Sequence, residues 1–329
     1  MADAKGLPQL DASSRRARAA AQLLHKSEPI GAADAVRRLL AVQAQDLRGA
    51  RLALRARTTA LTAGDVDAAI DDAEVVVSWL CRGTLHMVHR DDYAWVHALT
   101  APPVVTMNRR RLEQEGVRDP ERAVSIVLKA LAAGGPQVRS ELAEPVAAAG
   151  IATRGQAMIH ILLKATLAGD VVRGPLRGRE QTFALTRDWV GPLPRVDRDE
   201  ALAELGRRYL AAHAPADAAD LARWAGIRLS DARAAFRAAG DPADAARPGA
   251  ARPPRRIPPR LLGQFDPYIL GWKDRSFAVP PEHEKTLLPG GGMFRAVAID
   301  DGVVVGDWEA VASDRRFARE RADIERFQG

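Results

Sequence analysis

Hydrophobic residues recur at helical spacing through much of this 329-residue chain, and shorter apolar runs rich in β-branched residues interrupt them. In the first region, to about residue 118, the pattern predicts helices over 17–24, 32–40 and 48–57. Residues 75–80 and 84–88 are apolar and flank Arg82-Gly83, so they predict two β segments. Helices followed by a β-hairpin in this order are typical of a winged helix.

A second region, about 119–192, repeats this order with a basic loop in the wing position. Pro120 stands in the first turn of its first helix, where the missing N–H is harmless, and Pro145 is expected to shorten or bend the second. The predicted elements are helices over 120–133, from 140 onward and over 153–168, followed by strands over 170–173 and 182–185. The wing between the strands, residues 174–179, is rich in glycine and arginine, which suits contact with DNA.

Two further regions complete the predicted α+β organisation. A third helix-turn-helix rhythm predicts helices over 198–213, 216–225 and 230–239. Residues 241–260 carry six prolines and five arginines, which predicts a semi-rigid basic connector. After it, a charged helix over 314–327 follows strands predicted at 260–268, 293–299 and 303–308, with Asp300-Asp301-Gly302 as a hairpin turn. The predicted units are therefore 1–118, 119–192, 193–250 and 251–329, the first three winged helices and the last a small β domain.

Composition narrows the functional classes. The chain has 48 basic and 42 acidic residues, and 42 of the basic ones are arginines, which donate paired hydrogen bonds to phosphate. This excess is compatible with a nucleic-acid partner and equally with the codon usage of a GC-rich genome. Cys81 is the single cysteine, so no internal disulfide forms, and no apolar run approaches the length that crosses a bilayer. We expect a cytoplasmic protein without membrane contact.

A short polar segment interrupts the helices of the first region. Gln43, Gln45 and Asp46 place two amides and one carboxylate within four positions, just before the helix predicted over 48–57. A loop whose polar residues cap the next helix accounts for such a cluster without any chemistry. A catalytic segment is the alternative, and other parts of the sequence favour it.

Four segments resemble the bacterial winged-helix DNA glycosylases of the AlkZ/YcaQ type. They are VQAQDLRGARLALRAR at 42–57, SWLCRGTLHMV at 78–88, QFDPYILGWKDR at 264–275 and GGMFRAVAIDDGVVVGDW at 291–308. Gln43-Ala44-Gln45 matches the Gln-apolar-Gln motif of the AlkZ-like branch, where the YcaQ-like branch carries Gln-apolar-Asp. The resemblance implies tandem winged helices around a C-shaped DNA-binding cleft, a small C-terminal β-barrel, and excision of alkylated purines.

Two amides suit a reaction whose leaving group needs little acid catalysis. Alkylation at guanine N7 or adenine N3 makes the base cationic, so the base departs as a neutral molecule. A glutamine carbonyl can accept a hydrogen bond from a water near C1′, and its NH₂ can fix a neighbouring group. Gln43 and Gln45 are therefore predicted to position the water, with Asp46 an electrostatic partner or, alternatively, the base itself. The family pattern places no lysine as a Schiff-base nucleophile, which predicts a monofunctional glycosylase without cofactor or metal.

Residues of the family-like segments and of the basic runs are candidate DNA contacts. They are Arg48, Arg82, His86, Arg109, Arg110, Arg177, Arg179, Asp266, Trp272, Lys273, Arg275 and Arg295. Simpler explanations exist for several: His86 as a packed histidine, the arginines at 109–111 as a solvated helix face, and Asp266 as a turn former. His86 and His89 have the spacing of a metal pair, but a strand would direct them to opposite faces.

Two functional hypotheses follow from these features. The first is a monomeric DNA glycosylase that hydrolyses the N-glycosidic bond of cationic N7- or N3-alkylated purines in double-stranded DNA, including bulky or cross-linking adducts, in repair or self-resistance. When bound to DNA it would associate with the nucleoid. The second is a non-catalytic winged-helix DNA-binding protein or regulator. Three helical units in one chain, together with Gln43-Ala44-Gln45, favour the enzyme.

Overall fold

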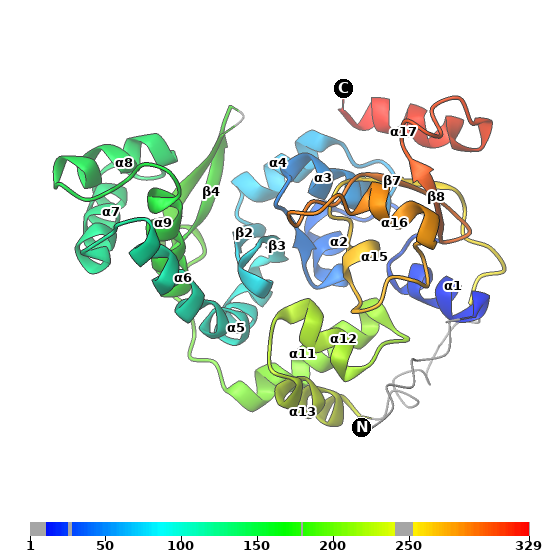
Figure 1. Cartoon of the computed structure of the whole chain (residues 1–329), viewed down its shortest axis with the longest axis horizontal. Coiled ribbons are helices and arrows are strands. Elements are labelled where there is room, and N and C mark those ends of the chain that lie inside the picture. The colour runs from blue at the N-terminus through cyan, green and yellow to red at the C-terminus, as the bar shows by residue number, and fades with distance from the viewer. Residues whose placement is uncertain (1–10, 26–27, 179, 241–252, 329) are drawn as a thin grey trace.

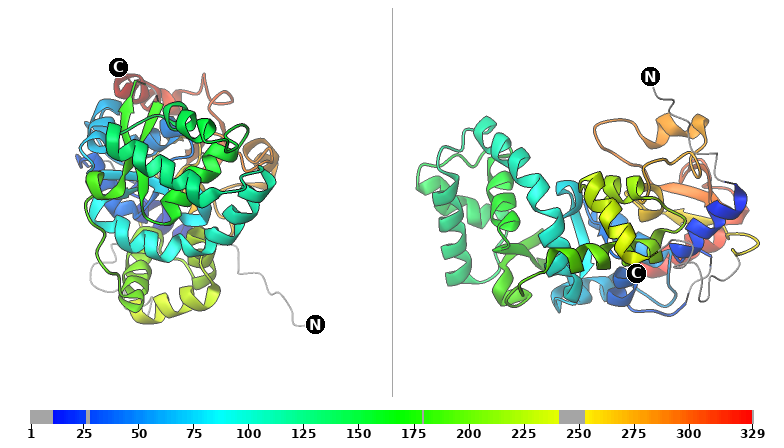
Figure 2. Two further views of the ribbon diagram at one scale, coloured as in Figure 1. Left: turned by 90° about the vertical axis from the view of Figure 1, so that its left-hand side faces the viewer. Right: turned by 90° about the horizontal axis from the view of Figure 1, so that it is seen from below.

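The computed structural model describes residues 11–25, 28–178, 180–240 and 253–328, and the predicted DNA contact Arg179 lies outside them. Helices outnumber strands, and two antiparallel sheets organise the chain (Figure 1). Helices α6 to α9 stand at one end of the molecule and the C-terminal elements at the other, which the further views in Figure 2 also show. No helix of the described residues has the length and apolar character needed to span a bilayer.

The first region contains the predicted helices and hairpin, together with a short strand and a helix over residues 63–71 that the sequence did not predict. Its elements are Ala12–Ala21 (α1), Ala32–Leu39 (α2), Val42–Gln43 (β1), Leu47–Arg55 (α3), Ala63–Asp71 (α4), Val75–Trp79 (β2), the 3₁₀ turn Cys81–Gly83 (η1) and Leu85–His89 (β3). Helix α4 begins with a capping box in which Thr62 and Asp65 bond each other's backbone N–H. Two helices that the sequence analysis did not predict follow, Arg90–Thr100 (α5) and Pro102–Gln114 (α6).

The second region has the predicted order of three helices and a hairpin. Its elements are Pro120–Gly134 (α7), Arg139–Ala148 (α8), Ala157–Leu167 (α9), Val171–Arg177 (β4), Glu180–Leu185 (β5) and the short Thr186–Trp189 (α10). Pro120 occupies the first turn of α7, and Asp119 caps that helix by accepting from the N–H of Arg122. Pro145 lies inside α8, which continues past it.

The hairpins of these two regions join into one five-stranded sheet. Its strand order is β1-β3-β2-β4-β5, and Val77 of β2 pairs with Arg173 of β4 across the boundary between the predicted units. Residues from both regions also share a hydrophobic core that extends to Phe327 near the C-terminus. The first two predicted units therefore form one packed body around a common sheet.

The third region is helical throughout its described part. Its helices are Arg198–His213 (α11), Ala218–Ala225 (α12) and Leu229–Ala239 (α13), close to the predicted ranges. Asp217 and Asp220 form a capping box at the start of α12, and Gly226 ends that helix in the left-handed conformation. Between 193 and 240 no strand is present, so the described residues of this unit supply no wing.

The C-terminal region differs from the predicted barrel. Its elements are Arg260–Leu262 (β6), Pro267–Leu270 (α15), Pro281–Leu287 (α16), Val297–Asp300 (β7), Val303–Asp307 (β8), the 3₁₀ turn Arg315–Phe317 (η2) and Ala318–Gln328 (α17). In the described residues the sheet is three-stranded with the order β6-β7-β8 and is open, so it does not by itself form the predicted small β-barrel. The strand predicted over 260–268 stops at Leu262, because Asp266 caps a helical turn that begins with Pro267.

The predicted hairpin turn at Asp300-Asp301-Gly302 is confirmed, and it packs against the other end of the chain. Asp301 and Gly302 both have positive φ, 49° and 77°, as a two-residue hairpin loop requires. The Asp301 carboxylate accepts a hydrogen bond of 2.6 Å from Nη2 of Arg16, on α1. Helix α1, which the sequence assigned to the first unit, therefore lies beside the C-terminal sheet (Figure 1).

Candidate active site

The two glutamines extend the first sheet at its edge. Gln43 lies in β1 opposite His86 of β3, and only 8% of its surface is exposed. Gln45 follows the strand and is exposed, and its Oε1 accepts a hydrogen bond of 3.1 Å from the backbone N–H of Leu85. Because both amides are anchored to the η1–β3 segment, their side chains have defined positions before any ligand binds.

Asp46 begins helix α3 and stays partly exposed. One carboxylate oxygen, Oδ2, accepts a hydrogen bond of 2.9 Å from the N–H of Gly49, as an N-cap does. The chain at Gln264 crosses the start of α3 closely, because a Cβ on Gly49 would lie 2.5 Å from the Gln264 carbonyl oxygen. The fold thus brings the segment that contains the glutamines against the segment 264–275, which lies more than two hundred residues away.

Arg82 connects the glutamines to the third region. Its backbone is in the left-handed conformation with φ of 58°, which is unusual for a residue with a side chain. Nη2 donates to Oε1 of Gln43 at 3.0 Å, and Nη1 donates to the backbone carbonyl of Trp224 on α12. Burial lowers the pKa of Arg82 from its ordinary value. Both terminal nitrogens of the guanidinium are engaged within the protein, although the side chain is only partly buried, and the DNA contact predicted for Arg82 stays a prediction.

His86 is buried beneath Gln43 and stays neutral. It is 2% exposed, and its ring Nδ1 lies 2.9 Å from the Thr84 carbonyl, to which it donates. Burial first, and the charge of Arg82 second, lower its pKa to about 3. The prediction of a DNA contact at His86 is therefore wrong. Among the described residues, no cluster of three or more His, Cys, Asp and Glu side chains is arranged to hold a metal ion.

Two further predicted DNA contacts belong to the interior. Asp266 is 1% exposed and forms a two-point ion pair with Arg57, with distances of 2.7 and 2.9 Å. Trp272 is fully buried, donates from Nε1 to the His213 carbonyl at 3.1 Å, and packs under the guanidinium of Arg18. The structure corrects both assignments, because neither Asp266 nor Trp272 has the surface to meet DNA.

Arg275 belongs to a cluster of three arginines beside the glutamine segment. Its Nε donates to the Ile269 carbonyl at 3.0 Å, and its guanidinium lies 5.1 Å from the ring centre of Phe294. Burial, and then the charges of Arg223 and Arg82, lower the pKa of Arg275. Arg82, Arg223 and Arg275 come from three different regions of the chain, so no local pattern indicates that Arg223 belongs with the other two.

The remaining predicted DNA contacts that fall within the described residues are on the surface. Those whose side chains are exposed are Arg48, Arg109, Arg110, Lys273 and Arg295. Arg177 is also exposed but pairs with Glu141 at 2.6 Å and donates to the Pro136 carbonyl. Arg109 and Arg110 lie on α6, and Val104 of the same helix packs against Gly83 of η1. The exposed arginines of α6 therefore stand on the helix that contacts the Arg82 turn.

Comparison with known proteins identifies the family. A family model for DNA glycosylase AlkZ-like proteins matches residues 36–327, which is most of the chain. The chain belongs to the AlkZ-like DNA glycosylase family. It is 27% identical over 322 residues to the interstrand DNA cross-link repair glycosylase of Streptomyces sahachiroi, with 88% of this chain and 85% of the relative covered. The solved structure of Streptomyces sahachiroi DNA glycosylase AlkZ matches with a TM-score of 0.77 and 24% identity, covering 96% of each chain, and thus has the same mixed fold.

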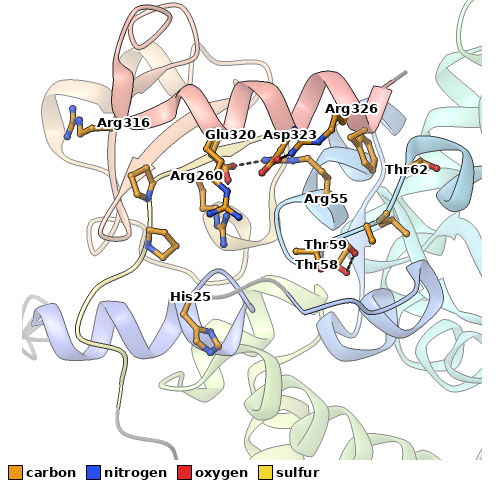
Figure 3. Close-up of a pocket in the computed structure, with 16 residues that line it drawn as sticks. His25, Arg55, Thr58, Thr59, Thr62, Arg260, Arg316, Glu320, Asp323 and Arg326 are labelled. Carbon is orange, nitrogen blue, oxygen red and sulfur yellow. Dashed lines mark hydrogen bonds and ion pairs between the residues drawn. The ribbon is translucent and has the colours of Figure 1, made fainter.

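The AlkZ-like glycosylase also has a polar pocket at the opposite end of α3 (Figure 3). It is lined by residues of α17, of the segment 58–62 and of the approach to β6. Its central carboxylate, Glu320, pairs with Arg55 at 2.9 Å and with Arg260 at 2.8 Å. Because α3 runs from Leu47 to Arg55, about 13 Å of helix separates this pocket from the glutamine segment. The pocket lies where the C-terminal helix α17 meets the first region and the approach to β6, apart from the candidate active site.

Buried histidines make the stability of the AlkZ-like glycosylase sensitive to acid. Burial lowers the pKa of His86 and that of His213 from 6.5 to about 3. The unfolded chain therefore binds more protons than the folded one between these values, so stability is full above about pH 6.5 and falls as the pH is lowered. We expect a loss of about 2 kcal/mol per histidine at about pH 5, measured by urea unfolding.

The variant His213→Gln tests this origin of the acid sensitivity. It removes one buried titrating group, so the decline in unfolding free energy between about pH 7 and pH 5 should shrink by about 2 kcal/mol. His283→Gln, on the half-exposed surface of α16, serves as the matched control and should leave the decline as in the wild type. An unchanged decline in His213→Gln would assign the acid sensitivity to other groups.

Proposed function

We propose that this AlkZ-like glycosylase hydrolyses the N-glycosidic bond of N7- or N3-alkylated purines in double-stranded DNA. The observation that carries the proposal is the placement of Gln43, Gln45 and Asp46. Two amides with anchored carbonyl groups and a partly exposed carboxylate lie together near three arginines, of which Arg82 and Arg275 are partly buried and Arg223 is exposed. The name of the Streptomyces sahachiroi relative supports extending the substrates to bulky and cross-linking adducts.

The order of elements supports two winged helices in tandem. In the first, β1 lies between α2 and α3 and pairs with β3, which pairs in turn with β2, so the hairpin gains a short third strand. In the second, α7 to α9 precede the hairpin β4–β5. We infer that DNA lies in a C-shaped cleft across the face that carries η1, α6 and the segment around Arg275, with the third helical region closing one side.

The structure favours Asp46 as the group that accepts a proton from water. Its Oδ2 is occupied by the N–H of Gly49, whereas within the described residues no protein group donates to Oδ1. The carbonyl oxygens of Gln43 and Gln45 already accept from Arg82 and from the Leu85 N–H. A carboxylate is also the stronger base. Because the alkylated purine leaves as a neutral base, the mechanism requires no strong acid and no cofactor.

Exposed cations supply the attraction to DNA. Arg48, Arg109, Arg110, Lys273 and Arg295 have the exposure that phosphate contacts require, and the chain has a formal net charge of +6. Since the several units lie in one chain, we propose that a monomer binds one damaged site. The enzyme would act in the cytoplasm, associated with the nucleoid when it binds DNA.

Exposed apolar side chains near the site fit bulky lesions. The exposed large hydrophobic residues in the described part of the chain are Val105, Met107, Leu229 and Met293. Met107 lies against Gly83, and Met293 adjoins Phe294, which packs on Arg275. Apolar side chains that border a DNA site act as wedges between bases or accept an apolar adduct. They support a substrate larger than a methyl group.

A panel of duplexes that each carry one lesion tests the proposed function. With enzyme in excess, we expect release of N7-methylguanine and 3-methyladenine, whereas uracil and 8-oxoguanine should stay in the duplex. Neutral bases leave as anions and need several further kcal/mol of stabilisation, and the one imidazole beside the amides, His86, is buried and uncharged. Chromatography of the released bases provides the measurement. Tight binding of every duplex with release of none would instead identify a non-catalytic DNA-binding protein.

A further inference from the structure

Hydrogen bonds fix which way each catalytic amide faces. A glutamine amide has an oxygen that accepts and a nitrogen that only donates. Oε1 of Gln43 lies 3.0 Å from the Arg82 guanidinium, and Oε1 of Gln45 lies 3.1 Å from the backbone N–H of Leu85. Both partners can only donate, so reversing either amide would place two donors against each other. The carbonyl oxygens therefore point into the protein.

The two NH₂ groups are left to face outward. Within the described residues, no protein group accepts a hydrogen bond from Nε2 of Gln43 or of Gln45. Nε2 of Gln43 is not among the buried polar atoms that lack a partner, although Gln43 itself is a buried residue. That nitrogen therefore keeps some solvent-exposed surface. The two glutamines therefore present hydrogen-bond donors outward. Binding the hydrogens of a water would require acceptors instead.

We propose that Gln43 and Gln45 act on the substrate as hydrogen-bond donors and that Arg82 is the positioning residue that holds Gln43 in this orientation. The inference rests on the proposed glycosylase function and changes the role of the amides within it. Arg82 reaches Gln43 with one nitrogen and the Trp224 carbonyl with another. It therefore ties the catalytic segment to the third helical region.

The turn that carries Arg82 is confined on two sides. A Cβ on Gly226, at the end of α12, would lie 3.0 Å from the Arg82 backbone nitrogen, and one on Gly83 would lie 2.9 Å from the Val104 side chain. Arg82 holds its left-handed φ of 58° in this confined space. A residue kept in an unfavourable conformation by tight packing on both sides has little freedom to move. The confinement gives Arg82 a fixed position from which to orient Gln43.

The outward NH₂ groups of Gln43 and Gln45 can stabilise the electron density that moves onto the purine during hydrolysis. The oxygen of the attacking water forms a bond to C1′ and its proton passes to the Asp46 carboxylate. The C1′–N9 bond breaks and its electron pair goes to N9, which neutralises the cationic ring. The electron density on the departing purine therefore increases as the reaction proceeds. Donors placed before the reaction stabilise such a transition state more than the ground state, so they affect the rate more than the affinity.

Substitution by glutamate separates donor from acceptor. In Gln43→Glu and Gln45→Glu one carboxylate oxygen can still accept from Arg82 or Leu85, while the outward group becomes an acceptor. We expect each variant to lose about 10²-fold in the single-turnover rate constant for N7-methylguanine release, as much as the corresponding alanine variant. Excision by Gln43→Glu and Gln45→Glu at or above the wild-type rate would overturn the proposal, because the amides would then act as acceptors.

The orientation of Gln43 can be tested without any excision. Gln43→Glu keeps an acceptor for Arg82 and should melt at or above the wild-type temperature, whereas Gln43→Met leaves the guanidinium without this partner and should melt lower. A lower melting temperature for Gln43→Glu than for Gln43→Met would show that the inward atom is not the oxygen. Wild-type protein that released no base would refute the proposed function, and these melting temperatures would still decide the orientation.

Replacement of Arg82 by lysine tests the positioning role. Lysine keeps the charge but cannot bond Gln43 and Trp224 with a planar fork, so we expect the rate constant to fall by about 10-fold or more, with DNA affinity nearly unchanged. Arg208→Lys is the matched control, since Arg208 likewise joins a side chain, that of Asp92, to a backbone carbonyl, that of Arg37. It should excise at the wild-type rate.

A double-mutant cycle decides whether Arg82 acts through Gln43. In the Gln43→Ala background, Arg82→Lys should cause little further loss, because the side chain that Arg82 orients is already absent. Fully additive losses, or a fall in DNA affinity that accounts for the whole effect of Arg82→Lys, would overturn the positioning role and return Arg82 to a phosphate contact.

Discussion

Replacing Asp46 by asparagine is expected to lower the single-turnover rate constant for N7-methylguanine release by about 10²–10⁴-fold, the usual contribution of a general base. The expectation follows from the two oxygens of this carboxylate. Oδ2 caps α3 through the N–H of Gly49, and asparagine caps a helix equally well, so the fold should be kept. What the substitution removes is the basicity of the partly exposed carboxylate. Quenched time courses with enzyme in excess would measure the loss.

The same substitution at another helix provides the control for Asp46. Asp119 caps α7 by accepting from the N–H of Arg122, far from the glutamines in the sequence. Asp119→Asn should therefore release the base at the wild-type rate and melt like the wild type. If Asp46→Asn also kept nearly full activity, the water would have to be held by other acceptors, and the second lone pairs of the glutamine carbonyls would be the remaining choice.

Asp266→Ala is expected to destabilise the protein by about 3–5 kcal/mol, the usual effect of removing one partner of a buried ion pair. Asp266 and Arg57 are both about 1% exposed and bond each other through two contacts, so the variant leaves a buried guanidinium without its counter-charge. It also removes the acceptor for the backbone N–H of Tyr268. Urea unfolding followed by tryptophan fluorescence would measure the change.

The control for Asp266 lies on the same segment. Asp274 is exposed and accepts hydrogen bonds from the backbone N–H and the hydroxyl of Ser276 close by, so Asp274→Ala should change the unfolding free energy by less than about 1 kcal/mol. Folded Asp266→Ala, assayed at low temperature, should bind DNA like the wild type. A loss of DNA affinity with unchanged stability would restore the direct DNA contact that the family-like sequence suggested.

Local sequence determined most of the helices and the hairpins. The periodic apolar faces of α2, α7 and α11 predicted these helices to within about two residues, because side chains three and four positions apart share a helix face wherever the chain lies. Asp301-Gly302 specified its own turn, since both residues tolerate positive φ. The motif residues Gln43, Gln45 and Asp46 could also be found from sequence, because they are close together in the chain.

The tertiary structure decided which of the other candidate DNA contacts lie on the surface of the protein. Asp266 and Trp272 resemble DNA contacts in the sequence, yet packing against Arg57, His213 and Arg18 buries both. Conversely, Arg223 gave no signal, and the fold sets it near Arg82 and Arg275. The sequence gives the charge of such residues but does not show how deeply they are buried. Their burial depends on elements that are far away along the chain.

How the predicted units pair with one another likewise could not be predicted from the sequence. Local patterns predicted separate hairpins for the first two regions, but the pairing of Val77 with Arg173 merges them into one sheet, and the C-terminal sheet remains open in the described residues. The orientation of Gln43 depends on Arg82, which in turn depends on Trp224. Periodicity and turn chemistry act over a few residues and could be predicted, whereas these contacts join positions that only the folded chain brings within hydrogen-bonding distance.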